Sequence, residues 1–185
     1  MFNIPNSITF SRILLIPVLV VVYLYDYKWS NFASAAIFAF AAITDWFDGY
    51  LARKLEQMSP FGAFLDPVAD KLMVSTALIL LVFSQGENLY IVISAIVIIG
   101  REITISALRE WMAELGKRAN VAVSMLGKIK TFTQMSAIAL LLYQNDFMTI
   151  PIFDVGLVLL VVSAILTIVS MLIYLKAAWP VIKNH

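Results

Sequence analysis

Residues 155–175 form an uninterrupted apolar run without a charged side chain, and this run limits what the chain can fold into. A helix needs about 20 predominantly apolar residues to cross the hydrocarbon core of a bilayer. The whole chain is similar in character, since 62% of its residues are hydrophobic and 14% are charged, against roughly 45–50% and 25% in soluble domains. We therefore expect an integral membrane protein.

The hydrophobic stretches and the short polar breaks between them predict an all-α bundle of six transmembrane helices. The expected spans are residues 5–25, 31–53, 61–84, 89–111, 124–144 and 152–176, in a single domain that covers residues 1–185. Only the last span contains a charge-free run of membrane length, and the other five take charged residues into one end. Charges inside a membrane are costly, so those five helix ends are candidates for a functional site.

The distribution of lysine and arginine predicts the orientation of these spans. If the N-terminus lies in the cytosol, Lys28 is the only basic residue on the outer side. Because basic residues accumulate in cytosolic loops, we expect both termini in the cytosol. All five charge-bearing helix ends then face the cytosol, which predicts an active site at the inner surface of the cell membrane.

The composition also excludes several kinds of chemistry. The chain has no cysteine, and its single histidine is His185, the last residue. A thiol nucleophile, a cysteine or histidine zinc site and a Ser-His-Asp triad are therefore excluded. The remaining metal chemistry uses oxygen ligands, which suit Mg²⁺, Mn²⁺ or Ca²⁺; of these we expect Mg²⁺ or Mn²⁺ as the cofactor. The net charge of +1 gives no reason to expect nucleic acid as a partner.

Four aspartates form the central cluster of the sequence. Asp45 and Asp48 are three residues apart at the end of the second expected helix, and Asp66 and Asp70 are four residues apart in the third. Each pair shares one helix face, and the short connection lets the two helices lie antiparallel. Four converging carboxylates repel one another unless cations neutralise them. We therefore expect one or two divalent ions at this cluster.

Small residues accompany the aspartates and predict a narrow groove beside them. Gly49, Ala52 and Gly62 carry almost no side chain, so a flat base and its ribose can approach the backbone. Taken singly, these features have simpler explanations. Two aspartates can form a structural pair or a proton relay, glycines often mark close helix packing, and Arg53 can be a snorkelling residue. Their combination at fixed spacing is what indicates a nucleotide site.

Residues 45–70 resemble the signature of the CDP-alcohol phosphotransferase family, D-x-x-D-G-x-x-A-R-x8-G-x-x-x-D-x-x-x-D, at every specified position. The resemblance implies a six-helix membrane enzyme, usually a homodimer, that is active at the cytosolic face. It implies that Asp45, Asp48 and Asp66 bind metal and that Asp70 is the general base with a further metal contact. It also implies a site for the CDP moiety formed by Asn6, Asp48, Gly49, Ala52, Arg53, Gly62 and Asp66.

A second cluster is basic and bears on the acceptor alcohol. It lies around the inner ends of the fourth and fifth spans, where two or three positioned cations would form a phosphate pocket. The candidate acceptor-phosphate ligands, with Thr9 from the first span, are Thr9, Arg101, Arg109, Arg118, Lys128 and Lys130. Basic residues are expected in inner loops from topology alone, so part of this cluster has a second explanation.

Stretches 3–12, 101–111 and 121–134 sharpen the resemblance. They are similar to the bacterial family members that join CDP-diacylglycerol to sn-glycerol 3-phosphate, releasing CMP. Three alternatives stay open at this point. The acceptor can be inositol phosphate or serine, the four aspartates can form the ion site of a divalent-cation transporter, or the chain can be purely structural. One-sided placement of the charges disfavours the transporter.

Overall fold

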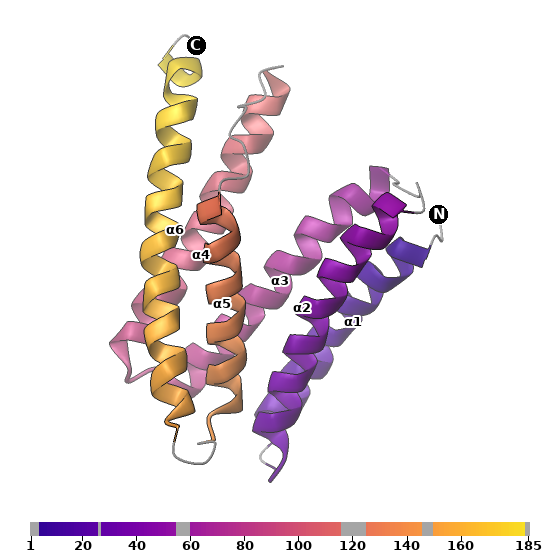
Figure 1. Ribbon diagram of the computed structural model, residues 1–185, viewed down its shortest axis with the longest axis vertical. Coiled ribbons are helices and arrows are strands. Elements are labelled where there is room, and N and C mark those ends of the chain that lie inside the picture. Colours follow the sequence, from indigo (N-terminus) through magenta and orange to yellow (C-terminus); the bar gives the residue numbers. More distant parts are fainter. Residues whose placement is uncertain (1–3, 26, 55–59, 116–124, 146–149, 184–185) are drawn as a thin grey trace.

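The computed structural model describes residues 4–25, 27–54, 60–115, 125–145 and 150–183, and in these residues the regular elements are six helices (Figure 1). They are α1 (Ile4–Leu24), α2 (Ser30–Lys54), α3 (Pro60–Gln85), α4 (Leu89–Glu114), α5 (Met125–Tyr143) and α6 (Ile152–Lys183). All six begin within one residue of the predicted start, which confirms the all-α prediction.

Local signals account for several of these boundaries. The side chain of Asn88 accepts a hydrogen bond of 3.1 Å from the backbone N–H of Tyr90 and so caps the start of α4. After Tyr143, Gln144 adopts a φ of 58°, a left-handed conformation that ends α5. The sixth helix continues to Lys183, beyond the predicted end at residue 176. Trp179 and Lys183 in this extension are residue types that favour a membrane interface, so the helix continues beyond its apolar stretch.

The helices form two groups that Figure 1 shows side by side, α1–α3 and α4–α6. Helix α1 packs against α2 and α3, α6 packs against α4 and α5, and contacts of α2 with α5 and of α3 with α4 join the groups. Each of the six helices contributes buried apolar side chains to one core. Fully buried examples are Leu19, Phe38, Leu81, Ile98, Leu141 and Leu160.

Apolar side chains cover much of the outer surface of the bundle as well as filling its core. Phe83 and Phe132, for example, are each about three-quarters exposed. Within the described residues, segments long and apolar enough to cross a membrane occur in three helices: Phe64–Gln85, Leu89–Glu114 and Ile152–Trp179. These spans and the exposed apolar side chains indicate a membrane protein, because exposing so much apolar surface to water is energetically unfavourable. The six-span topology stays a prediction.

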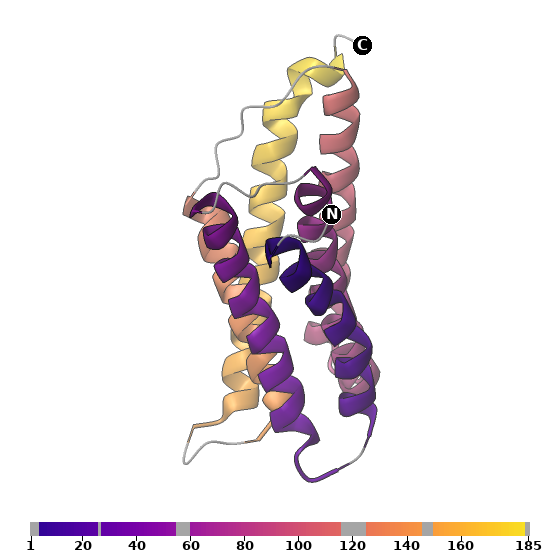
Figure 2. The same cartoon turned by 90° about the vertical axis from the view of Figure 1, so that its right-hand side faces the viewer.

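The N-terminal end of α1 and the C-terminal end of α6 lie toward the same end of the bundle (Figures 1 and 2). The last turns of α2 and the first turns of α3 lie at this end too. We call it the carboxylate end, because it contains Asp45 and Asp66. The opposite end is held by a polar network in which the Tyr23 hydroxyl contacts the hydroxyl of Ser84 and accepts a hydrogen bond of 3.2 Å from Nε2 of Gln144.

Candidate active site

Arg12 lies at the centre of the carboxylate end, although it belongs to α1 and not to the helices that carry the aspartates. Its side chain is only 3% exposed. One guanidinium nitrogen, Nη1, contacts Asp45 on α2, and the other, Nη2, lies 3.3 Å from Oδ1 of Asp66 on α3. The Thr9 hydroxyl, one turn before Arg12, donates to the same Asp66 oxygen. Three helices are thus joined through one cation.

Asp70 lies one turn beyond Asp66 on α3 and faces the same region. It lines a small cavity with Arg12, Ala69 and Met135. Its carboxylate is within electrostatic range of Asp45 and of the charged pair Glu102 and Lys130. Asp70 therefore lies between the carboxylate cluster and the basic residues.

The donor types at the carboxylate end fit a hard divalent cation. Asp45 and Asp66 come from different helices, yet both reach the same guanidinium, so the fold brings two carboxylates to one positive charge. Oxygen ligands of this kind suit Mg²⁺ and Mn²⁺. Among the residues described, no group of three or more acidic side chains encloses a site for an ion. Asp48 is also a predicted metal ligand, but its side chain is not among those that the structure describes.

Three of the predicted acceptor-phosphate residues occur in two different settings. Lys130 is buried, and its Nζ lies 2.8 Å from Oε1 of Glu102, which also accepts from Nη1 of Arg101 at 3.0 Å. Arg109 is exposed and stacks over the ring of Tyr174 at 5.4 Å, a cation–π contact. Arg101 and Lys130 are therefore neighbours, whereas Arg109 has a structural partner of its own on α6.

A groove of about 860 Å³ runs between α2 and α5. Most of the side chains that line it are apolar or small, such as Phe38, Ala42 and Phe132. Two charged residues, Asp45 and Lys128, also line it. One groove thus combines an apolar wall with a carboxylate of the central cluster and an exposed cation.

Other predicted residues are only partly described. Gly62 is buried near the start of α3. Five further predicted residues lie in helices, but the structure does not describe their side chains: Asn6 in α1 and Asp48, Gly49, Ala52 and Arg53 in α2. Arg118 lies outside the described residues altogether. Their predicted roles stay predictions.

Sequence reasoning did not place two charged residues in the site. Arg12 and Glu102 were recognisable as charges inside expected spans, and intramembrane charges are functional candidates by default. Their partners are 33 and 28 residues away in the chain. The missing information was therefore which helices lie side by side, and no local pattern carries it.

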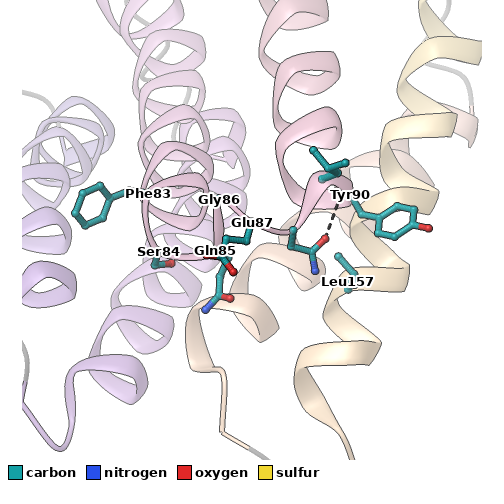
Figure 3. A pocket seen from close by; sticks show the side chains of 9 residues that line it. Phe83, Ser84, Gln85, Gly86, Glu87, Tyr90 and Leu157 are labelled. Atoms are coloured by element: carbon teal, nitrogen blue, oxygen red, sulfur yellow. Dashed lines mark hydrogen bonds between the residues drawn. The ribbon is translucent and has the colours of Figure 1, made fainter.

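A second large cavity, of about 900 Å³, lies at the opposite end of the bundle (Figure 3). It is formed by the turn from Phe83 to Tyr90 with Leu157 of α6, and Glu87 is the one charged residue among its lining. The side chain of Asn88, which caps α4, accepts a hydrogen bond from the backbone N–H of Tyr90 in this lining. This cavity lacks the clustered carboxylates and cations of the carboxylate end, so we do not assign the site to it.

Comparison with known proteins identifies the class to which this fold and site belong. Residues 2–174 match the model of the CDP-alcohol phosphatidyltransferase family, so the chain belongs to that family of transferases.

Curated relatives narrow the class further. A Pseudomonas fluorescens protein is 53% identical over 183 residues, which cover 98% of this chain and 93% of the relative. Proteins from Shigella flexneri serotype 5b and Escherichia coli K12 are each 52% identical over 177 residues, covering 96% of this chain and 95% of each relative. All three are named CDP-diacylglycerol–glycerol-3-phosphate 3-phosphatidyltransferase.

Proposed function

We propose that this chain transfers the phosphatidyl group of CDP-diacylglycerol to sn-glycerol 3-phosphate, which gives phosphatidylglycerophosphate and CMP. The observation that carries the proposal is the identity of 52–53%, over nearly the full length, with relatives that bear the name of this activity. The geometry supports it, because a carboxylate cluster, a lipid-sized groove and a pair of buried cations lie close together.

The carboxylates would hold the cation and the nucleotide end of the donor. Asp45, Asp48 and Asp66, with Asp70, would bind Mg²⁺ or Mn²⁺. A bound divalent cation supplies neutralisation of the pyrophosphate charge and makes CMP a better leaving group. Arg12 keeps Asp45 and Asp66 in place from α1. The CDP moiety would lie against the small residues of α2 and α3, with Asn6 and Arg53 at its edge.

Asp70 would act on the acceptor alcohol. Its carboxylate accepts the proton of the attacking hydroxyl group as that oxygen forms a bond to the lipid-side phosphorus. The bond from that phosphorus to the bridging oxygen breaks, and CMP leaves with the electron pair. The bundle would hold both substrates in one orientation. This lowers the entropic part of the activation barrier, because the reacting groups are already positioned next to each other.

The remaining contacts divide between the two substrates. The groove between α2 and α5 would take an acyl chain of the donor, with Lys128 near its phosphate. Arg101 and Lys130, with Thr9, Arg109 and Arg118, would bind the phosphate of the acceptor. Positive charge of this kind suits a phosphorylated alcohol and not a cationic alcohol such as choline.

We further propose that the domain covers residues 1–185 with six spans, that both termini and the site face the cytosol, and that the enzyme is a homodimer in the cell membrane. The basic residues support the orientation, because all but Lys28 fall on one side of the predicted topology.

An acceptor panel tests the proposed function. Purified protein in detergent micelles is incubated with CDP-diacylglycerol, Mg²⁺ or Mn²⁺ and one acceptor: sn-glycerol 3-phosphate, glycerol, serine or inositol phosphate. We expect CMP release with sn-glycerol 3-phosphate and its loss when a chelator removes the metal. Faster turnover with serine or inositol phosphate would overturn the choice of acceptor.

A further inference from the structure

Glu102 is a half-buried acid among the predicted phosphate-binding cations, and the proposed mechanism gives it no role. It lies on α4, and its side chain is 23% exposed. A single oxygen, Oε1, accepts hydrogen bonds from both Arg101 and Lys130, at 3.0 and 2.8 Å. Since both cations contact the same atom, Glu102 holds two positive groups together that would otherwise repel each other.

Lys130 depends on this contact for its position. It comes from α5, and within the described residues α4 and α5 have no close backbone contact of their own, because each packs against α6. The lysine side chain is 6% exposed, and Glu102 is the one described side chain that its ammonium group contacts. A buried cation without a partner is costly. Removing the carboxylate should therefore displace the Lys130 ammonium.

Arg101 retains unused hydrogen-bonding capacity. Its Nη1 contacts Glu102 and its Nη2 contacts the hydroxyl of Ser170 on α6 at 3.1 Å. Its Nε is buried and makes no hydrogen bond to any described residue. Buried donors in proteins are nearly always paired, so this nitrogen points to a group that binds here. Glu102 and Asp70 both lie within electrostatic range of Lys130, so an anion that binds here would do so through the unused donors of Arg101 and Lys130.

We propose that Glu102 is a positioning residue of the acceptor-phosphate site, which sets Arg101 and Lys130 at the spacing that a phosphate monoester needs. This inference rests on the proposed function and deepens it. Glu102 need not touch the phosphate. It fixes the two cations, and a phosphate of charge near −2 then binds both of them through charge-assisted hydrogen bonds.

Steady-state kinetics of Glu102→Gln in micelles test the inference, with each substrate varied in turn. We expect the KM for sn-glycerol 3-phosphate to rise about tenfold or more, as for the loss of a hydrogen bond to a charged group. The KM for CDP-diacylglycerol should stay within about twofold, since Glu102 does not contact the donor groove. Glu110→Gln, at an exposed acid of the same helix, is the control and should change neither KM.

A double variant tests whether Glu102 acts through Lys130. If it does, Glu102→Gln combined with Lys130→Met should raise the acceptor KM only slightly above that of Lys130→Met alone, through the remaining contact of Glu102 with Arg101. The double variant also removes both members of the buried pair, so it gives the answer where the single Glu102→Gln variant does not fold. Fully additive effects would overturn the inference.

The remaining outcomes separate the inference from the proposed function. An unchanged acceptor KM in Glu102→Gln, or equal increases in both KM values, would overturn the positioning role while leaving the transferase activity intact. Failure of the unmodified protein to use sn-glycerol 3-phosphate at all would overturn the proposed function, and the inference with it.

Discussion

At the scale of single residues, Arg12 is the side chain on which the carboxylate end depends most. It is almost fully buried, and it contacts one aspartate from α2 and one from α3. A buried cation needs such partners, and the aspartates in turn need a positive charge. Arg12 therefore holds Asp45 and Asp66 close to one another.

Replacing Arg12 tests this dependence. Arg12→Gln leaves both carboxylates without their shared counter-ion, and we expect a loss of about 1–3 kcal/mol in stability, discounted because the aspartates are partly exposed. Transferase activity should fall by about two orders of magnitude or more, and Arg12→Lys should be intermediate because an ammonium group lacks the fork that reaches two partners. Thermal unfolding in detergent and initial rates measure both effects. Lys28→Gln, at an exposed residue of the opposite end, is the control.

Asp70 carries a separate prediction, because its role is proton transfer. Asp70→Asn keeps the shape of the side chain but removes the base, and general base catalysis contributes about 10²–10⁴-fold to rate. We expect kcat to fall within that range while labelled CDP-diacylglycerol still binds. Activity near that of the unmodified protein would rule out Asp70 as the base.

At the scale of helices, α5 and α6 pack closely at Gly156. A Cβ atom at Gly156 would lie 3.0 Å from Cγ of Leu141 and 3.1 Å from Cβ of Leu140. Small residues allow such approaches between membrane helices. Gly156 thus lets the backbone of α6 pack directly on α5, and this contact sets where α5 presents Lys130.

Two alanine substitutions compare a packed glycine with an open one. Gly156→Ala forces a methyl group into the contact with α5, and we expect a loss of about 1–3 kcal/mol. Gly100→Ala places its methyl group where nothing lies within 4 Å, so it should be neutral or slightly stabilising. The midpoints of thermal unfolding in detergent measure the difference. Equal midpoints for both variants would contradict the packing of α5 on α6.

The helices could be predicted from the sequence better than the contacts between them. Their starts follow from turns of polar residues, as at Asn88, which the chain displays locally. The end of α6 was misjudged because no glycine or polar turn stops the helix between Lys176 and Lys183. In the site, fixed spacing identified the aspartates. The partners of Arg12 and Glu102 depend on helix pairing, which local pattern does not encode.

At the scale of the whole molecule, the site is assembled from helices that lie far apart in the sequence. Helices α1, α2 and α3 supply Arg12 and the aspartates, and α4 and α5 supply the basic residues. Both ends of the helical part lie toward the carboxylate end (Figure 2). If that end faces the cytosol, the soluble substrate enters directly and the lipid substrate enters from the membrane.

The absence of cysteine allows this orientation to be tested by labelling. Single cysteines are introduced as Lys28→Cys and Lys183→Cys, both at exposed residues near opposite ends. In intact cells, a membrane-impermeant maleimide should label the first variant, whereas the second should react only after the membrane is opened. Labelling of Lys183→Cys from outside would reverse the proposed topology.

This chain moves a phosphatidyl group from a CDP-lipid to a phosphorylated alcohol. The most direct measurement incubates the purified protein with CDP-diacylglycerol and radiolabelled sn-glycerol 3-phosphate, then quantifies CMP and labelled lipid in the same sample. We predict equal amounts of CMP and phosphatidylglycerophosphate, and no CMP without the acceptor. CMP release without labelled lipid would instead mean hydrolysis of the donor and would contradict the claim.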